Sequence, residues 1–142
     1  MTTDALTRED TAFLARPLHG FLAVAAAAQP PQPRPVWFEV TTEATLQFFT
    51  GPDSPKLRSL RLDPRACLVV AAPVGERERW VSVTARATIE AGGGRELASR
   101  LAARYWDLRD PQRAGELDGI LAAEQVRVVL HPQSVRRFGT TR

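Results

Sequence analysis

The sequence has few of the side chains from which most active sites are built. It contains one cysteine, Cys67, so no disulfide framework can form and we expect a reducing, cytoplasmic setting. Cys67 lies within an apolar run, and we expect it in the core rather than at a nucleophilic site. The two histidines, His19 and His131, have no cysteine, histidine or carboxylate at metal-ligand spacing. We therefore predict no metal site.

Motifs for the familiar kinds of catalysis are absent as well. There is no Walker loop, no G-x-S-x-G elbow and no G-x-G-x-x-G turn after a strand, and the glycines at 92–94 lack that spacing. We predict no catalytic residue from such motifs. An enzyme with this sequence needs a cofactor to carry its reactive centre.

Long apolar runs and blocks of one charge are also missing. The longest apolar run, residues 20–28, is far too short to span a bilayer, and the polar, acidic residues 1–10 are unlike a signal peptide. The net charge is +3, but arginines alternate with acidic residues, as in 76–79, so no basic stripe is formed. We expect neither a membrane nor a nucleic acid as partner.

What is present is the composition of a globular domain. Of the 142 residues, 44% are hydrophobic and 25% charged, which fits a single domain over residues 1–142 with a sizeable core. We find no internal repeat and no linker long enough to divide the chain. Six apolar or alternating runs predict strands, at 20–27, 36–40, 45–50, 66–72, 80–89 and 125–130.

The segments between these runs predict turns and helices. We expect helices from Thr7 to Ala15, after Ser54, through the leucines at 97–108, and from Pro111 to Ala123. The proline-rich residues 29–35 are predicted to be a hairpin loop, and 134–138 a short edge segment after a break at Pro132. The alanines of 20–27 also permit a helix. Strands in direct succession predict an antiparallel sheet closed as a barrel, mainly β with peripheral helices.

One turn stands out as a binding site. Ser54 is a good N-cap and Pro55 suits the first helical position, so Lys56 lies in the first turn of a helix. A cation is usually disfavoured there, and Lys56 is the only lysine of the chain. With the hydroxyls of Thr50 and Ser54 nearby, this pattern fits a bound anion such as a phosphate. The alternative is a solvated surface charge.

Five segments follow one another in a familiar order. They are Pro35–Phe38, Leu46–Gly51, Ser54–Leu57, Asp63–Arg65 and Trp80–Ile89. Their order and spacing resemble the pyridoxamine 5'-phosphate oxidase-like flavoproteins, and most closely the small flavin/deazaflavin oxidoreductases. The resemblance covers about 13–89 well and the last strand loosely. It implies a split β-barrel that forms a homodimer and binds flavin at the subunit interface.

The resemblance also implies which residues bind the cofactor. Arg34 matches an arginine that reaches the phosphate or the flavin, and Trp80 matches a position that contacts flavin from the partner subunit. Val36, Trp37 and Phe38 would line the isoalloxazine ring. The phosphate-binding element would comprise Phe49, Thr50, Gly51, Ser54, Lys56 and Leu57. For Trp37 and Trp80, ordinary packing in the core or a dimer interface is the alternative.

The resemblance favours FMN as cofactor and hydride transfer at flavin N5 as reaction, with an unidentified small molecule as substrate. The deazaflavin F420 is an alternative, since Arg58, Arg61 and Arg65 could bind its polyglutamate tail. A non-catalytic flavin-binding or storage module, or a haem-binding relative, is another. Pro55 and Glu39 stand where the pyridoxamine oxidases carry basic residues, and their C-terminal Arg-x-His pattern is absent, which argues against that substrate.

Overall fold

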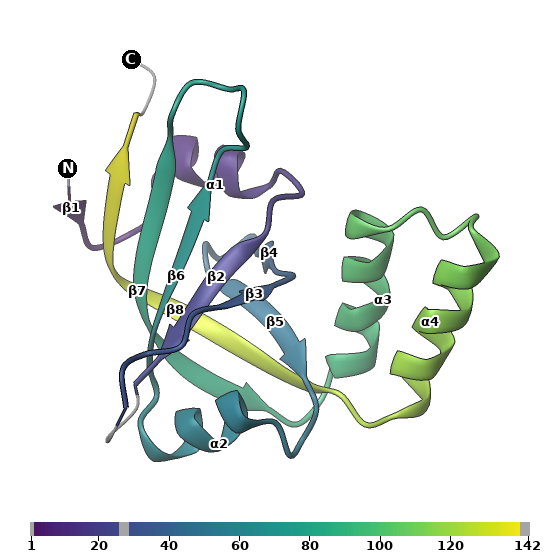
Figure 1. The fold of residues 1–142 in the computed structure, drawn as a ribbon. Helices are drawn as coiled ribbons and strands as arrows, with labels where there is room; N and C mark the ends of the chain where they lie inside the picture. Colours follow the sequence, from purple (N-terminus) through teal and green to yellow (C-terminus); the bar gives the residue numbers. More distant parts are fainter. Residues whose placement is uncertain (1, 26–28, 140–142) are drawn as a thin grey trace.

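The computed structural model describes residues 2–25 and 29–139. Within them the chain forms eight strands and four helices (Figure 1). In order these are β1 (Thr2–Thr3), α1 (Arg8–Leu14), β2 (Gly20–Val24), β3 (Arg34–Val36), β4 (Glu39–Val40), β5 (Leu46–Thr50), α2 (Pro55–Leu62), β6 (Arg65–Ala71), β7 (Trp80–Glu90), α3 (Gly94–Tyr105), α4 (Pro111–Ala122) and β8 (Val126–Phe138).

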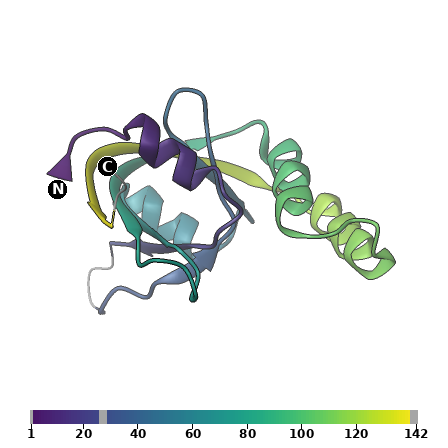
Figure 2. The same cartoon turned by 90° about the horizontal axis from the view of Figure 1, so that it is seen from above.

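The strands form one antiparallel sheet. Its order is β3-β2-β6-β7-β8-β5-β4, and β1 pairs with the far end of β8. The sheet curls almost to a closed outline when seen from above (Figure 2), with α1 at its upper end and α2 at its lower end. The helices α3 and α4 project to one side. This arrangement is the split β-barrel that the sequence predicts.

The core lies inside the curled sheet. β7 alternates between buried and exposed side chains along most of its length, as its sequence pattern predicts, because successive side chains of a strand point to opposite faces. The ends of the barrel are filled by Phe13 and Leu14 of α1 and by Leu57 and Leu60 of α2, all at most 2% exposed. The amphipathic faces of these two short helices therefore complete the core.

The local signals for helices are confirmed. The Thr7 side chain accepts a hydrogen bond from the Asp10 backbone N–H while the Asp10 carboxylate accepts one from the Thr7 N–H, which is a capping box. α2 begins as predicted, with Ser54 at the N-cap and Pro55 at the first position. The helix expected through the leucines at 97–108 is α3, which already ends at Tyr105, and the helix expected from Pro111 to Ala123 is α4.

The strand predictions need three corrections. The count of about six is too low, because β1 and the broken segment 36–40 add short strands. Residues 36–40 do not form one strand: β3 ends at Val36, Trp37 and Phe38 are unpaired, and β4 begins at Glu39. The loop expected over 29–35 ends earlier, because Arg34 and Pro35 already belong to β3, an edge strand where proline is tolerated.

The prediction for the last strand is also wrong. Pro132 does not break it, and 134–138 is no edge segment, because β8 runs unbroken and pairs with β7 from Arg127 to Phe138. The register shifts between Thr84 and Ala85, whose partners are Ser134 and Pro132, so Gln133 forms a bulge. A bulge accommodates a proline inside a strand.

Two further predictions concern the first strand and the cysteine. Gly20–Val24 is a strand rather than a helix, while residues 26 and 27 of the predicted run lie outside the described residues. Cys67 is half-buried, with its Sγ 3.4 Å from the Ser82 Oγ, so it is not a core residue as predicted. It alternates with the buried Ala66 and Leu68 and therefore points to the outer face of the sheet. No helix in the described parts of the chain is long and apolar enough to cross a membrane.

Candidate cofactor site

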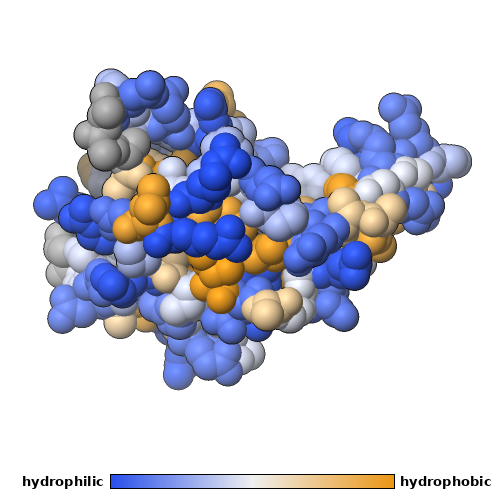
Figure 3. Space-filling model, turned by 90° about the horizontal axis from the view of Figure 1, so that it is seen from below, coloured by the Kyte–Doolittle hydropathy of each residue, from blue (hydrophilic) through white to orange (hydrophobic). Residues whose placement is uncertain are grey.

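Five residues from β3, the segment after it, β5 and α2 line a cavity of about 230 Å³. They are Pro35, Val36, Trp37, Phe49 and Lys56. The fold therefore brings four of the predicted site residues to one place. On the lower face of the molecule, where α2 lies, apolar side chains gather between hydrophilic ones (Figure 3).

Lys56 gives this cavity its charge. Its side chain is half-buried, and its Nζ lies 6.0 Å from the centre of the Phe48 ring. Burial lowers the pKa of Lys56, and the charge of the nearby Arg34 lowers it further. No carboxylate within the described residues forms an ion pair with either cation. An anion in the cavity would relieve this repulsion. It would also lie beside the N-terminus of α2, where the helix dipole favours negative charge.

The turn between β5 and α2 precedes Lys56 in the chain, but none of its residues lines the cavity. Thr50 is the buried last residue of β5, and Gly51 follows it. The Ser54 Oγ accepts a hydrogen bond from the Leu57 N–H at 3.2 Å, so its oxygen is used as the helix cap. The hydroxyl hydrogen of Ser54 remains available to a ligand.

Seven of the predicted residues are not among those that line the cavity: Arg34, Phe38, Thr50, Gly51, Ser54, Leu57 and Trp80. Phe38 and Leu57 are core residues, 1% and 0% exposed, so only their backbone can take part. Trp80 lies on the outer face of the sheet, where it stacks on Phe138 with ring centres 6.1 Å apart. There it lines a second, mainly apolar hollow of about 360 Å³ with Val69, Ala71, Ser82 and Arg136.

The sequence analysis missed the residues that hold Trp37. The indole of Trp37 stacks on the Tyr105 ring, with centres 5.3 Å apart and planes at 5°, and meets the edge of Trp106 at 4.7 Å. Phe49 lies at 6.3 Å on another side. The adjacent aromatics Tyr105 and Trp106 at the end of α3 were the available signal, but nothing local to them indicates Trp37 as their partner.

Comparisons with known proteins agree with this architecture. A family model described as pyridoxamine 5'-phosphate oxidase matches residues 6–136. The chain belongs to the pyridoxamine 5'-phosphate oxidase family. No curated protein matches the sequence. The family is of oxidoreductase type, which agrees with the flavin-related reading of the sequence.

Solved structures with the same fold have different functions. An F420 reductase is 25% identical, covers 88% of this chain and 94% of its own, and superimposes with a TM-score of 0.69. An FAD-binding protein from Mesorhizobium loti is 21% identical, with coverage of 98% and 99% and a TM-score of 0.63. The haem storage protein HutZ from Vibrio cholerae is 18% identical, with coverage of 96% and 95% and a TM-score of 0.64. Below 25% identity, such likeness shows the fold alone.

The lining of the cavity limits its chemistry. Apart from Lys56 it consists of apolar and aromatic side chains, so it can bind and orient a planar ring with an anionic group. Among the described residues, no cluster of three or more histidine, cysteine or acidic side chains could hold a metal ion. Redox chemistry at this lining would require a bound cofactor, because none of its five side chains carries a redox centre.

Proposed function

We propose that this protein is an FMN-dependent oxidoreductase in which Lys56 and Arg34 hold the flavin phosphate. The observation that carries the proposal is the pair of like charges beside the cavity and the α2 N-terminus, with no carboxylate as ion-pair partner among the described residues. A phosphate there gains a charge-assisted hydrogen bond from Lys56 and lies near the positive end of the α2 dipole.

The remaining residues of the cavity would orient the ring. Val36 and Trp37 form an apolar wall, and Phe49 packs edge-on against Trp37. The turn at Thr50, Gly51 and Ser54 would lie toward the phosphate. Bound flavin supplies hydride transfer at N5. The chain contributes orientation, exclusion of water and positive charge, because the described cavity lining contains no acid–base pair. The substrate would be a small molecule in a cytoplasmic setting.

The proposal includes a homodimer. The outer face of the sheet exposes Phe21 and Phe138, 47% and 52% exposed, around the hollow that contains Trp80. Burying this face against a second copy would remove apolar surface from water. In such a dimer Trp80 of one subunit would contact the flavin of the other, which explains why it is remote from Lys56 within one chain.

The rival cofactor is F420. The likeness to an F420 reductase, at 25% identity, favours it. The arginines that could hold its polyglutamate tail are partly engaged: Arg58 donates to the Asp53 carbonyl oxygen and Arg65 pairs with Asp63. Arg61 is exposed at the end of α2. Mass spectrometry and absorption spectra of the cofactor released from protein purified from its native host distinguish F420 from FMN.

The other rival is a flavin-binding or haem-binding module without catalysis. Both histidines lie outside the cavity: His19 stacks on Tyr105, and His131 hydrogen-bonds to the Thr88 hydroxyl at 2.9 Å. The cavity therefore lacks a histidine as axial ligand. Reduction of the bound flavin by NAD(P)H or a deazaflavin donor supports the enzyme, and bound flavin that no donor reduces supports storage.

The assignment of Lys56 is tested by a flavin titration. We expect Lys56→Ala to weaken FMN binding more than about tenfold, because a hydrogen bond to a charged group contributes about 1.5–3 kcal/mol. Riboflavin, which has no phosphate, should bind the variant as well as it binds the wild type. Arg109→Ala is the matched control, since it removes one cation from an exposed site. Equal FMN affinities of wild type and Lys56→Ala would rule out the phosphate site.

A further inference from the structure

Trp37 and Phe38 cross the split in the barrel. β3 is one edge of the sheet and β4 is the other edge, yet these two residues are all that join them. Neither residue is paired in the sheet, because the β2–β3 ladder ends at Val36 and the β4–β5 ladder begins at Glu39. The wall of the cavity at Trp37 is therefore not held by the sheet's own hydrogen bonds.

Tyr105, the last residue of α3, supplies the hydrogen bonds that the sheet does not give to this segment. Its hydroxyl donates to the Leu18 carbonyl oxygen at 2.7 Å and accepts from the Phe38 N–H at 3.3 Å. Its ring covers one face of the Trp37 indole at 5.3 Å. One side chain thus bonds the unpaired backbone and stacks on the residue that lines the cavity.

The end of α3 is itself tied to the barrel. Arg104 donates hydrogen bonds to the carbonyl oxygens of Leu14, Ala15 and Arg16, where α1 ends. One turn earlier, Arg100 pairs with Glu39 of β4 at 2.9 Å. Tyr105 therefore has a defined position relative to the end of α1 and to the β4 edge of the sheet, although α3 lies outside the barrel (Figure 1).

We propose that Tyr105 is a positioning residue that holds Trp37 against the cavity and so determines how tightly a planar ring binds there. Tyr105 is not among the residues that line the cavity. The part of this inference that concerns ring binding rests on the proposed function. The part that concerns the placement of Trp37 does not, and it is tested in the protein without ligand.

The first test uses the protein labelled with 5-fluorotryptophan. Its three tryptophans give three fluorine resonances, assigned by single Trp→Phe variants. Tyr105→Phe keeps the ring and removes both hydroxyl bonds, and we expect it to shift or broaden the Trp37 resonance while that of Trp80 stays in place. Arg104→Gln, which frees the end of α3, should move the same resonance.

The second test compares two ligands. Tyr105→Phe should weaken FMN and riboflavin equally, by about three- to tenfold, the loss expected from one or two neutral hydrogen bonds. Lys56→Ala should weaken FMN alone. The ratio of the two affinities thus separates an effect on the ring from an effect on the phosphate.

Val135→Ala is the control for general destabilisation, because Val135 is buried in β8 and does not line the cavity. A Trp37 resonance that is unchanged in Tyr105→Phe, or that moves as much in Val135→Ala, overturns the proposal. Unchanged affinities for FMN and riboflavin in Tyr105→Phe overturn the part of the proposal that concerns ring binding. If wild type binds neither FMN nor riboflavin, the proposed function fails, and the fluorine spectra still decide the role of Tyr105.

Discussion

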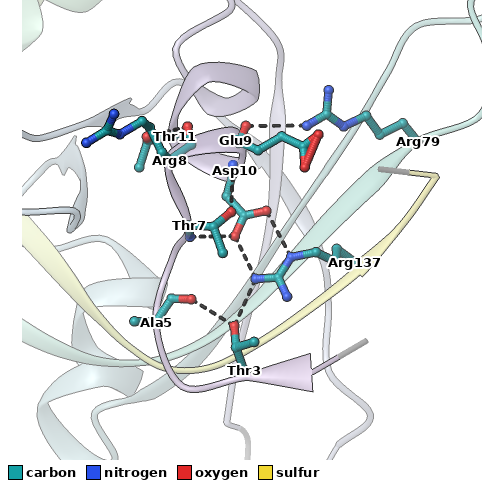
Figure 4. Close-up of polar contacts among 9 residues, drawn as sticks. All are labelled: Thr3, Ala5, Thr7, Arg8, Glu9, Asp10, Thr11, Arg79 and Arg137. Atoms are coloured by element: carbon teal, nitrogen blue, oxygen red, sulfur yellow. Dashed lines mark hydrogen bonds and ion pairs between the residues drawn. The ribbon is translucent and has the colours of Figure 1, made fainter. Parts of the chain in front are cut away.

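At the scale of single residues, the ion pair of Asp10 and Arg137 is the most deeply buried of those in the described residues. The side chains are 0% and 5% exposed, and two hydrogen bonds of 2.9 and 2.6 Å join them (Figure 4). The Asp10 carboxylate also accepts from the Thr7 N–H, and Arg137 donates to the Thr3 hydroxyl. Removing one partner of a buried ion pair is strongly destabilising, because it leaves the other charge buried and unpaired. This contact therefore attaches the N-terminal segment firmly to β8.

This pair predicts a dependence of stability on pH. Burial alone would raise the pKa of Asp10, but the hydrogen bonds from Arg137 and Thr7 outweigh it and hold the pKa below the ordinary 3.8. A carboxyl with a lowered pKa in the folded state stabilises above its unfolded value and loses that contribution as pH falls. We expect the free energy of unfolding, measured by urea denaturation, to fall below about pH 4.

Asp10→Asn should flatten this decline more than the control Asp107→Asn, whose carboxyl pairs with Arg109 at an exposed site. Identical pH profiles for Asp10→Asn and wild type would contradict the role of the buried pair.

At the scale of elements, the glycines at the start of α3 decide how closely that helix approaches β8. The sequence analysis found only that the glycines at 92–94 lack the spacing of a nucleotide-binding turn. In the structure Gly93 has φ +89 and Gly94 lies against the backbone where β8 begins. A Cβ on Gly94 would be 2.0 Å from the Gln125 carbonyl oxygen, a backbone atom that cannot move aside cheaply. The close approach of helix and strand therefore requires glycine.

We expect Gly94→Ala to lower the free energy of unfolding by about 1–3 kcal/mol, the usual cost of overpacking. Gly92→Ala is the matched control, because a Cβ there meets nothing within 4 Å and the backbone has no positive φ. Urea denaturation of the three proteins measures the difference. Equal losses in both variants would show that the contact with Gln125 is not the cause.

At the scale of the whole molecule, the fold gathers apolar side chains on the outer face of the sheet. Phe21, Trp80 and Phe138 come from three strands, and the pairings β2–β6, β6–β7 and β7–β8 bring them to the same sheet. None of these residues indicates a surface when read along the chain. Together they support the proposed homodimer.

The proposed dimer predicts a change of mass. Wild type should sediment as a dimer, and Phe138→Glu should shift it to monomer, because a charge would be buried in the interface. Val74→Glu is the control: Val74 is also exposed but lies in the turn before β7, away from the sheet face. Analytical ultracentrifugation measures both. A monomeric wild type, or a dimer that survives Phe138→Glu unchanged, would contradict this interface.

The sequence alone determined the features that depend on neighbours along the chain. The caps at Thr7 and Ser54, the place of Lys56 in the first turn of α2 and the alternation of β7 follow from local propensity and periodicity. The segment resemblance adds the barrel and most of the cavity lining. These features form as predicted because they need no distant partner.

Only the tertiary structure decided the contacts between distant residues. The unbroken β8 exists because β7 pairs with it around a bulge, which overrides the local effect of Pro132. Tyr105 meets Phe38 across 67 residues, and Arg137 meets Asp10 across 127. Such partners are selected by how the sheet curls and where its edges meet. The curl of the sheet, and not any local pattern, placed Trp37 between the cavity and α3.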